Sequence, residues 1–266
     1  MDKYVIEGGH PLRGPLRVSG SKNTALALMA GALLASGEST ISNVPALKDI
    51  STFSQVMQVC GAEVAYDETT HELRIDASEI SSYEAPYELV KKMRASFYML
   101  GALLGRFGEA RVSLPGGCAW GPRPVDLHIK GMRAFGAEIE LDEGYVEAEA
   151  PGGRLDGGRF RLEPSSVGAT INLLLAAVHA KGRSRIENAA IEPDVVVFAR
   201  ALQQMGARIE GLGTRTLTVD GVDELEPIEF RNCPDRIELG TFMLWASLTG
   251  EPGEPVTITN GETDHL

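Results

Sequence analysis

The sequence lacks the features that mark secreted and membrane-spanning proteins. Its 266 residues include three cysteines, Cys60, Cys118 and Cys233, which are odd in number and far apart, so no disulfide framework is expected. No apolar run approaches the roughly 20 residues of a membrane span, and no basic region followed by an apolar one marks a secretory signal. We therefore expect a protein of the reducing cytoplasm with no membrane partner.

Positive charge is also scarce overall. The formal net charge is −12, which argues against broad nucleic-acid binding, because such proteins carry a basic face. A local cluster can still focus a positive field against the net charge, so a small anionic ligand is not excluded. The basic residues that could form such a cluster lie in loop regions: Lys22, Lys91, Lys92, Arg94 and Arg123.

Motifs for metals, dinucleotides and P-loop phosphates are missing as well. The sequence has no H-E-x-x-H or C-x-x-C spacing, and no G-x-G-x-x-G opens a helix after a strand. Gly116 and Gly121 have the spacing of a P-loop, but Pro122 follows where lysine is needed. Neither a metal nor a cofactor is expected. Of the five histidines, His128 is the one placed to share a pocket with Arg123.

The most informative segment that is present is the loop LPGGCAWGPRP at 114–124. It places Cys118 among three glycines and three prolines, with Arg123 five residues on. A strand-like segment precedes the loop and an amphipathic one follows, and such connections often carry reactive side chains. Arg123 could supply the positive charge that activates a thiol. The alternative is a surface loop with an incidental cysteine; the lack of apolar residues to bury the thiol favours function.

A repeat of roughly 70 residues runs through the chain. Each unit reads helix–strand–helix–strand–strand. The Ala- and Leu-rich helices are apolar on nearly all sides, so we expect them to be buried inside the strands. A glycine follows each helix as its expected left-handed cap. These glycines fall into two interleaved series, Gly61, Gly136 and Gly206 in one and Gly37, Gly108, Gly182 and Gly250 in the other. The predicted class is α/β, with inner helices and outer sheets.

The repeat begins a fourth time and does not finish. Residues 236–249 repeat the buried-helix pattern, and 256–259 give the strand that should follow it. Two strand-like segments, 4–7 and 16–19, stand before the first helix as a pair, and we assign them to the unfinished unit. The predicted division is a complete three-repeat domain at 22–233, which carries the cysteine loop, and a partial second domain formed by 1–21 plus 234–266.

Three helix starts form a second candidate site. Ser21 fits the N-cap of the first buried helix, and a helix N-terminus that carries Lys22 is a natural seat for phosphate or carboxylate. A simple capped helix is the alternative. The segments 91–96 and 165–170 open the next two buried helices at the same position of the repeat. Three such starts facing one place would surround an anion with backbone N–H groups.

Together these segments resemble the UDP-N-acetylglucosamine 1-carboxyvinyltransferases, the enolpyruvyl transferases that begin peptidoglycan precursor synthesis. The resemblance runs over the whole sequence, and the cysteine loop is its most specific part. It implies an inside-out α/β barrel of two similar domains, each of three repeats, in agreement with the repeat above. The matching segments are SGSKN at 19–23, KMRAS at 92–96, the loop from 114 to 128, SVGAT at 166–170, ENAA at 187–190 and PDRIE at 234–238.

The resemblance also implies roles for single residues. Cys118 would be the general acid at the enol methylene and the thiol that fosfomycin alkylates. Phosphoenolpyruvate would be held by Lys22, Arg94 and Arg123. The UDP-sugar would be contacted by Asn23, Arg94, Tyr98, Pro124, Val125, Asp126, Leu127, Ser166, Val167 and Gly168. Two departures are visible: Tyr98 stands where relatives often have tryptophan, and the Pro164-Ser165 pair where they often have lysine.

The implied reaction transfers the enolpyruvyl group from phosphoenolpyruvate to the 3-hydroxyl of UDP-N-acetylglucosamine and releases phosphate. It needs a proton donor at the enol carbon and cations at the phosphate and carboxylate, with no metal. Family members continue for roughly three repeat units beyond the point where the fourth unit begins here, so this chain is expected to be incomplete for catalysis. The alternative is a binding-only or inactive fragment that retains part of the UDP-sugar site.

Two further expectations follow from the resemblance. A shikimate-pathway enolpyruvyl transferase of the same fold is opposed by the Pro-Gly-Gly-Cys loop and by Asp126. The 236–249 helix should expose an apolar surface, which self-association through the incomplete second domain could cover.

Overall fold

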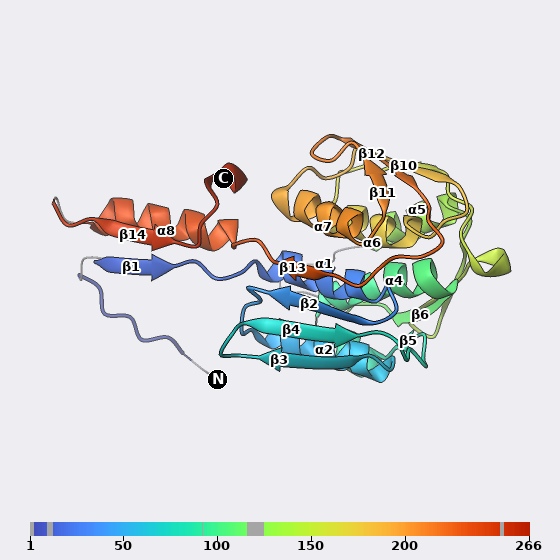
Figure 1. Cartoon of the computed structure of the whole chain (residues 1–266), viewed down its shortest axis with the longest axis horizontal. Coiled ribbons are helices and arrows are strands. Elements are labelled where there is room, and N and C mark those ends of the chain that lie inside the picture. Colours follow the sequence, from blue (N-terminus) through green and yellow to red (C-terminus); the bar gives the residue numbers. More distant parts are fainter. Residues whose placement is uncertain (1–2, 10–12, 92, 116–124, 251–252) are drawn as a thin grey trace.

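The computed structural model describes residues 3–9, 13–91, 93–115, 125–250 and 253–266. Buried helices occupy the middle of its main body and sheets lie on the outside (Figure 1). The α-helices are α1 (Lys22–Ala32), α2 (Lys48–Val59), α3 (Tyr87–Val90), α4 (Tyr98–Phe107), α5 (Asp126–Ala134), α6 (Val167–Ala177), α7 (Pro193–Gln204) and α8 (Arg236–Thr249). Short 3-10 turns are η1 (Arg94–Phe97), η2 (Pro151–Gly153) and η3 (Thr263–His265). This is the α/β class that the repeat predicts.

The strands within the described residues form three four-stranded sheets and one pair. They are β1 (Gly14–Arg17), β2 (Glu38–Ser42), β3 (Glu63–Asp67), β4 (Glu72–Asp76), β5 (Glu84–Ala85), β6 (Glu109–Ser113), β7 (Glu138–Asp142), β8 (Tyr145–Glu149), β9 (Arg159–Arg161), β10 (Arg183–Glu187), β11 (Arg208–Glu210), β12 (Thr216–Asp220), β13 (Glu229–Arg231) and β14 (Val256–Thr259).

The three larger sheets share one arrangement, which confirms the repeat. Their orders are β13-β2-β4-β3, β5-β6-β8-β7 and β9-β10-β12-β11, and in each the first pair is parallel and the other two are antiparallel. The parallel strand comes from the neighbouring unit. For the first sheet that strand is β13, which follows the third unit and pairs with β2, so Phe230 lies opposite Ile41. The three units therefore close into a ring.

The inner helices are buried because they have no polar face to present to water. Every residue of α1 from Thr24 to Ala32 and of α6 from Ala169 to Ala177 is buried, and α4 is buried from Met99 to Gly105. The three helices contact one another at the centre of the ring. Two glycines of α4 permit the closest of these contacts: a Cβ on Gly101 would lie 2.2 Å from the Asn172 side chain, and one on Gly105 would lie 2.4 Å from the Leu175 carbonyl oxygen.

The predicted helix caps are correct for only part of the glycines. Gly61, Gly136 and Gly206 have φ of +105°, +99° and +108° directly after α2, α5 and α7. In the other series Gly108 caps α4 in the left-handed conformation. Gly37 has positive φ but stands beyond the end of α1, at the entry to β2, while Gly250 is extended with φ of −65°. Gly182 has no positive φ and lies beyond the end of α6, because that helix stops at Ala177 and a turn intervenes.

The first and last parts of the chain lie side by side, apart from the ring (Figure 1). The predicted strand at 16–19 is present in part as β1, and it pairs in parallel with β14 and not with residues 4–7. The prediction for 4–7 is wrong: these residues form no strand, and Tyr4, Val5 and Ile6 are exposed.

Helix α8 has the predicted bounds and exposes apolar side chains, as expected. Leu248 is 84 % exposed and Leu244 is 68 % exposed, and Ile237, Met243 and Trp245 are also exposed. No helix in the described ranges is both long and apolar enough to cross a membrane.

We expect Gly105→Ala to destabilise the chain by about 1–3 kcal/mol, because the new methyl group would overlap the Leu175 carbonyl and push α4 from α6. Urea unfolding measures the change. Gly240→Ala in α8 is the control, since its nearest neighbour is 3.9 Å away and alanine favours a helix by roughly 0.5–1 kcal/mol. Equal stability of Gly105→Ala and the wild type would contradict the close packing of these helices.

Candidate functional site

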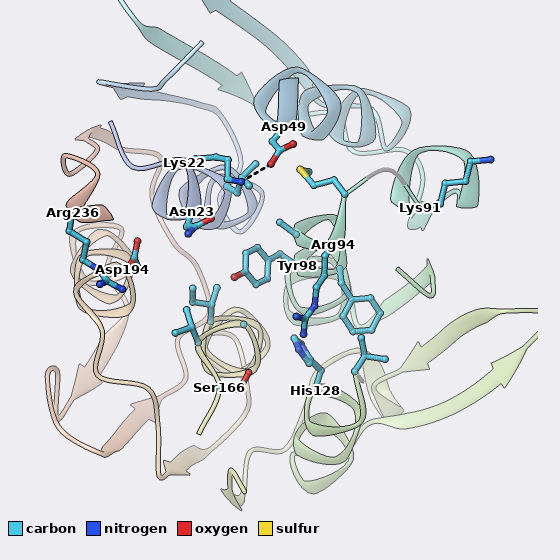
Figure 2. Close-up of a pocket in the computed structure, with 18 residues that line it drawn as sticks. Lys22, Asn23, Asp49, Lys91, Arg94, Tyr98, His128, Ser166, Asp194 and Arg236 are labelled. Atoms are coloured by element: carbon cyan, nitrogen blue, oxygen red, sulfur yellow. Dashed lines mark hydrogen bonds and ion pairs between the residues drawn. The ribbon is translucent and has the colours of Figure 1, made fainter. Parts of the chain in front are cut away.

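A cavity of about 630 Å³ opens between the ends of the inner helices. Its walls come from α1, α2, η1, α4, α5, α6, α7 and α8, so segments far apart in the sequence share it (Figure 2). The cavity brings together eight of the predicted site residues: Lys22, Asn23, Arg94, Tyr98, Val125, Ser166, Val167 and Gly168.

Two further predicted residues, Asp126 and Leu127, are described but are not among those that line the cavity. Asp126 and Leu127 lie in the first turn of α5, next to Val125. The Asp126 carboxylate accepts a hydrogen bond from Lys130 at 2.8 Å, and this bond lowers its pKa. The other three predicted site residues, Cys118, Arg123 and Pro124, lie outside the described residues.

Two of the three predicted helix starts have the expected form. The Ser21 hydroxyl accepts a hydrogen bond from Thr24 N at the start of α1, and the Ser166 hydroxyl accepts one from Ala169 N at the start of α6. The first residues of α1 and of α6 line the cavity, so the positive ends of two helix dipoles lie there and favour an anion.

The third start is different from the prediction. Lys91 follows the short helix α3 and Met93 is extended, with φ of −152°, so the chain re-enters helical geometry through the 3-10 turn η1 before α4 begins at Tyr98. Arg94 opens this turn and extends into the cavity, while Lys91 points away from the other labelled side chains (Figure 2) and pairs with Glu88.

Two carboxylates in the cavity were missed by sequence reasoning. Asp49 of α2 pairs with Lys22, with 3.0 Å between Nζ and Oδ2 (Figure 2). Asp194, in the first turn of α7, accepts hydrogen bonds from the hydroxyls of Ser21 and Thr24 and from Arg236 Nε at 3.3 Å. The signal for Arg236 was present in the PDRIE segment, but nothing local marks Asp49 or Asp194, because their partners lie on other helices.

The site is cationic in balance. Three cations, Lys22, Arg94 and Arg236, face two carboxylates, Asp49 and Asp194, around the same space. With two helix N-termini added, the arrangement suits an anionic ligand. No group of His, Cys, Asp or Glu side chains that could hold a metal occurs among the described residues.

The imidazole of His128 and the phenol of Tyr98, which both line the cavity, are uncharged near pH 7. Burial, together with the nearby charge of Arg94, lowers the pKa of His128 from its ordinary value to about 4, and Asp126 acts weakly in the opposite direction. Burial likewise raises the pKa of Tyr98. The thiols of Cys60 and Cys233 are buried, and their pKa values rise to about 12 and about 11 mainly through that burial, so neither is a reactive thiolate near pH 7.

Comparison with known families identifies the class of protein. Residues 6–266 match the EPSP synthase (3-phosphoshikimate 1-carboxyvinyltransferase) family, and the chain belongs to it. Among solved structures it is similar to the enolpyruvyl transferase NikO from Streptomyces tendae, with a TM-score of 0.83 and 28% identity over 96% of this chain and 59% of that one. EPSP synthase from Acinetobacter baumannii shares the fold, with a TM-score of 0.72 at 19% identity over 91% of this chain and 54% of that one.

Relatives with higher sequence identity share the name of one kind of enolpyruvyl transferase. The chain is 53% identical over its whole length to a UDP-N-acetylglucosamine 1-carboxyvinyltransferase of Chloroherpeton thalassium and 49% identical to one of Chlorobaculum parvum. It spans 61% and 62% of the length of these two relatives. The expected resemblance and the inside-out α/β fold of the enolpyruvyl transferases are thus confirmed.

The state of His128 predicts a pH dependence of stability. Its pKa is about 4 in the folded chain against 6.5 as the ordinary value, so below pH 6.5 the unfolded chain takes up a proton that the folded chain refuses. The contribution of His128 to the free energy of unfolding is therefore complete above pH 6.5. It decreases as the pH falls, by about 2 kcal/mol at pH 5. Urea unfolding at pH 7 and pH 5 should show this loss in the wild type and not in His128→Gln. The same pH dependence in both proteins would contradict the assignment.

The Lys22–Asp49 pair predicts how the cavity responds to loss of a negative charge. Asp49→Asn should raise the affinity for inorganic phosphate several-fold, because it frees the Lys22 ammonium and makes the cavity more positive. Calorimetric titration at low and high salt measures this, and the gain should shrink with salt. Glu72→Gln, which breaks a comparable pair with Arg74 on β4, is the control. Weaker binding by Asp49→Asn would mean that Asp49 instead holds Lys22 in place for the anion.

Proposed function

We propose that this chain carries the sugar-nucleotide half of a UDP-N-acetylglucosamine 1-carboxyvinyltransferase. That activity transfers the enolpyruvyl group from phosphoenolpyruvate to the 3-hydroxyl of UDP-N-acetylglucosamine in the cytoplasm, the first committed step of peptidoglycan synthesis. The observation that carries the proposal is the cavity that holds Lys22, Asn23, Arg94 and the N-terminus of α6 together, in a chain 53% identical to an enzyme of that name.

The proposed roles are those that the family resemblance implies, and the charge and position of the described residues support them. Lys22 and Arg94 hold the phosphate and carboxylate of phosphoenolpyruvate, with Arg123 as a third cation. Ser166, Val167 and Gly168 present the N-terminus of α6 to the diphosphate of the sugar nucleotide. The other proposed sugar-nucleotide contacts are Asn23, Tyr98, Pro124, Val125, Asp126 and Leu127.

The proposed chemistry runs through a tetrahedral ketal. Cys118 donates a proton to the methylene carbon of phosphoenolpyruvate, which leaves cationic character at C2. The sugar 3-hydroxyl attacks C2 and loses its proton to a base. The ketal then loses a proton from the new methyl group and expels phosphate, which restores the double bond. The cations stabilise the charge on phosphate throughout, and the sequence of bond changes balances without a metal or redox cofactor.

We also propose that the chain contributes to two domains. Residues 22–233 form the three-repeat domain, and 1–21 with 234–266 belong to a second one, which in the relatives would close over the site. Because the chain spans 61% of the Chloroherpeton relative, we expect turnover to need the part outside this span. A binding-only module is the alternative, and association of two copies over the exposed face of α8 is a further proposed interaction.

A phosphate-release assay tests the function. With phosphoenolpyruvate and UDP-N-acetylglucosamine, we expect turnover when the remaining part of the Chloroherpeton relative is supplied, and little from this chain alone. Lys22→Met should reduce the supplemented rate by at least about 100-fold, because one charged contact to the transferred group is lost. Shikimate 3-phosphate is the control substrate and should give no release. Release with shikimate 3-phosphate instead of the sugar nucleotide would overturn the proposal.

Labelling by fosfomycin tests the proposed acid separately. Mass spectrometry should find one adduct, on Cys118, in the wild type in the presence of UDP-N-acetylglucosamine, and none in Cys118→Ser. Cys233→Ser is the matched control. It should still be labelled on Cys118, because the buried, protonated Cys233 thiol is not expected to react with fosfomycin in the wild type. An adduct on Cys60 or Cys233 would contradict the assignment of Cys118.

A further inference from the structure

The side chain of Asn172, in the middle of α6, is fully buried and joins three other elements. Its Oδ1 accepts a hydrogen bond from Gly101 N of α4 at 2.8 Å. Its Nδ2 donates to the Phe97 carbonyl at the end of η1 at 3.0 Å and lies 2.9 Å from Nδ1 of His128 on α5. The orientation of the amide is fixed, because a backbone N–H can only donate and a carbonyl can only accept.

This orientation decides where the proton of His128 resides. The second N–H of the Asn172 amide points at Nδ1 of the imidazole, so Nδ1 must accept and the proton of the neutral ring must be on Nε2. An imidazolium or the other tautomer would place a hydrogen on Nδ1 against the amide hydrogens. The ring plane is held by Phe97, which packs edge-on with 5.3 Å between ring centroids.

The Nε2 atom is directed at the site. It has no hydrogen-bond partner in the described part of the chain, although the whole residue is only 4% exposed. His128 lines the cavity, and a Cβ built on Gly168, in the first turn of α6, would lie 3.8 Å from Nε2. Arg94 extends toward the same ring (Figure 2). A hydrogen-bond donor at this point therefore faces the place where an anion would sit.

We infer that Asn172 is a positioning residue that holds His128 as the neutral Nε2–H tautomer, so that the ring donates a hydrogen bond to an oxygen of an anionic ligand beside Gly168. The neutral state agrees with the low pKa of His128, which burial and Arg94 lower and Asp126 only partly restores. The tautomer follows from the structure alone; the use of its donor on a UDP-sugar rests on the proposed function.

Nitrogen-15 NMR of labelled histidine in the full chain tests the tautomer. In the wild type, without ligand at pH 7, the two-bond couplings should identify His128 as Nε2–H; an Nδ1–H tautomer or an imidazolium would overturn the inference. Asn172→Asp should move a proton to Nδ1, because a carboxylate there can only accept. Asn232→Asp is the matched control: Asn232 is also fully buried, but it bonds to Ser21 and Asn43, and its change should leave the His128 tautomer alone.

Titration with UDP-N-acetylglucosamine tests the donor. Binding should shift the Nε2–H resonance, and His128→Phe, which keeps a ring but loses the donor, should weaken binding about tenfold. His128→Gln should bind within about twofold of the wild type, because its amide nitrogen can occupy the place of Nε2. Wild-type-like binding by His128→Phe would overturn the donor role. An Nε2–H tautomer in a wild type that binds no sugar nucleotide would leave the positioning by Asn172 standing and count against the proposed function.

Discussion

The structure depends on the burial of three helices that have no polar side. α1, α4 and α6 are apolar all round, so each is stable only when protein surrounds it completely. No single sheet can do this. The three sheets do so together, because each takes a parallel strand from its neighbour and β13 returns to pair with β2. The ring and the buried helices therefore require each other, and Gly101 and Gly105 let α4 approach α6 closely enough to leave no gap.

The site is a consequence of this arrangement. Helices buried along their length still have ends, and the N–H groups at those ends must be satisfied. Ser21 and Ser166 each satisfy one of them, the Asn172 side chain satisfies Gly101 N in the first turn of α4, and the first residues of α1 and α6 line the cavity with Arg94. Asn172 links the core to the cavity, since the same amide that bridges α4 and α6 in the core also orients His128 at the cavity wall. Packing and chemistry are thus coupled through one buried polar group.

The sequence predicted what depends on local pattern. The bounds of α8 and β14, the buried state of α1 and α6, and the cap at Ser21 all follow from composition and periodicity, and all are confirmed. It did not predict what depends on distant partners. The three-residue strand β13 has too few residues for a pattern, and Asp49 and Asp194 acquire meaning only through side chains on other helices. Residues 4–7 show the converse, because an apolar run of high strand propensity forms no strand here without a partner strand.

Helix α8 differs from the inner helices in that most of its surface is not buried. Most of its apolar side chains, among them Leu244 and Leu248, are exposed, and Leu239 is its one buried residue. Polar contacts hold its first turn: the Asp235 side chain caps it, Glu238 accepts a hydrogen bond from Ser19 N, and Arg236 Nε donates to Asp194 at the cavity wall. Ionic interactions of this kind weaken with salt, whereas the packing of the apolar core does not. An anion in the cavity would compete with Asp194 for Arg236, so the contact that joins the first turn of α8 to α7 depends on what the cavity holds.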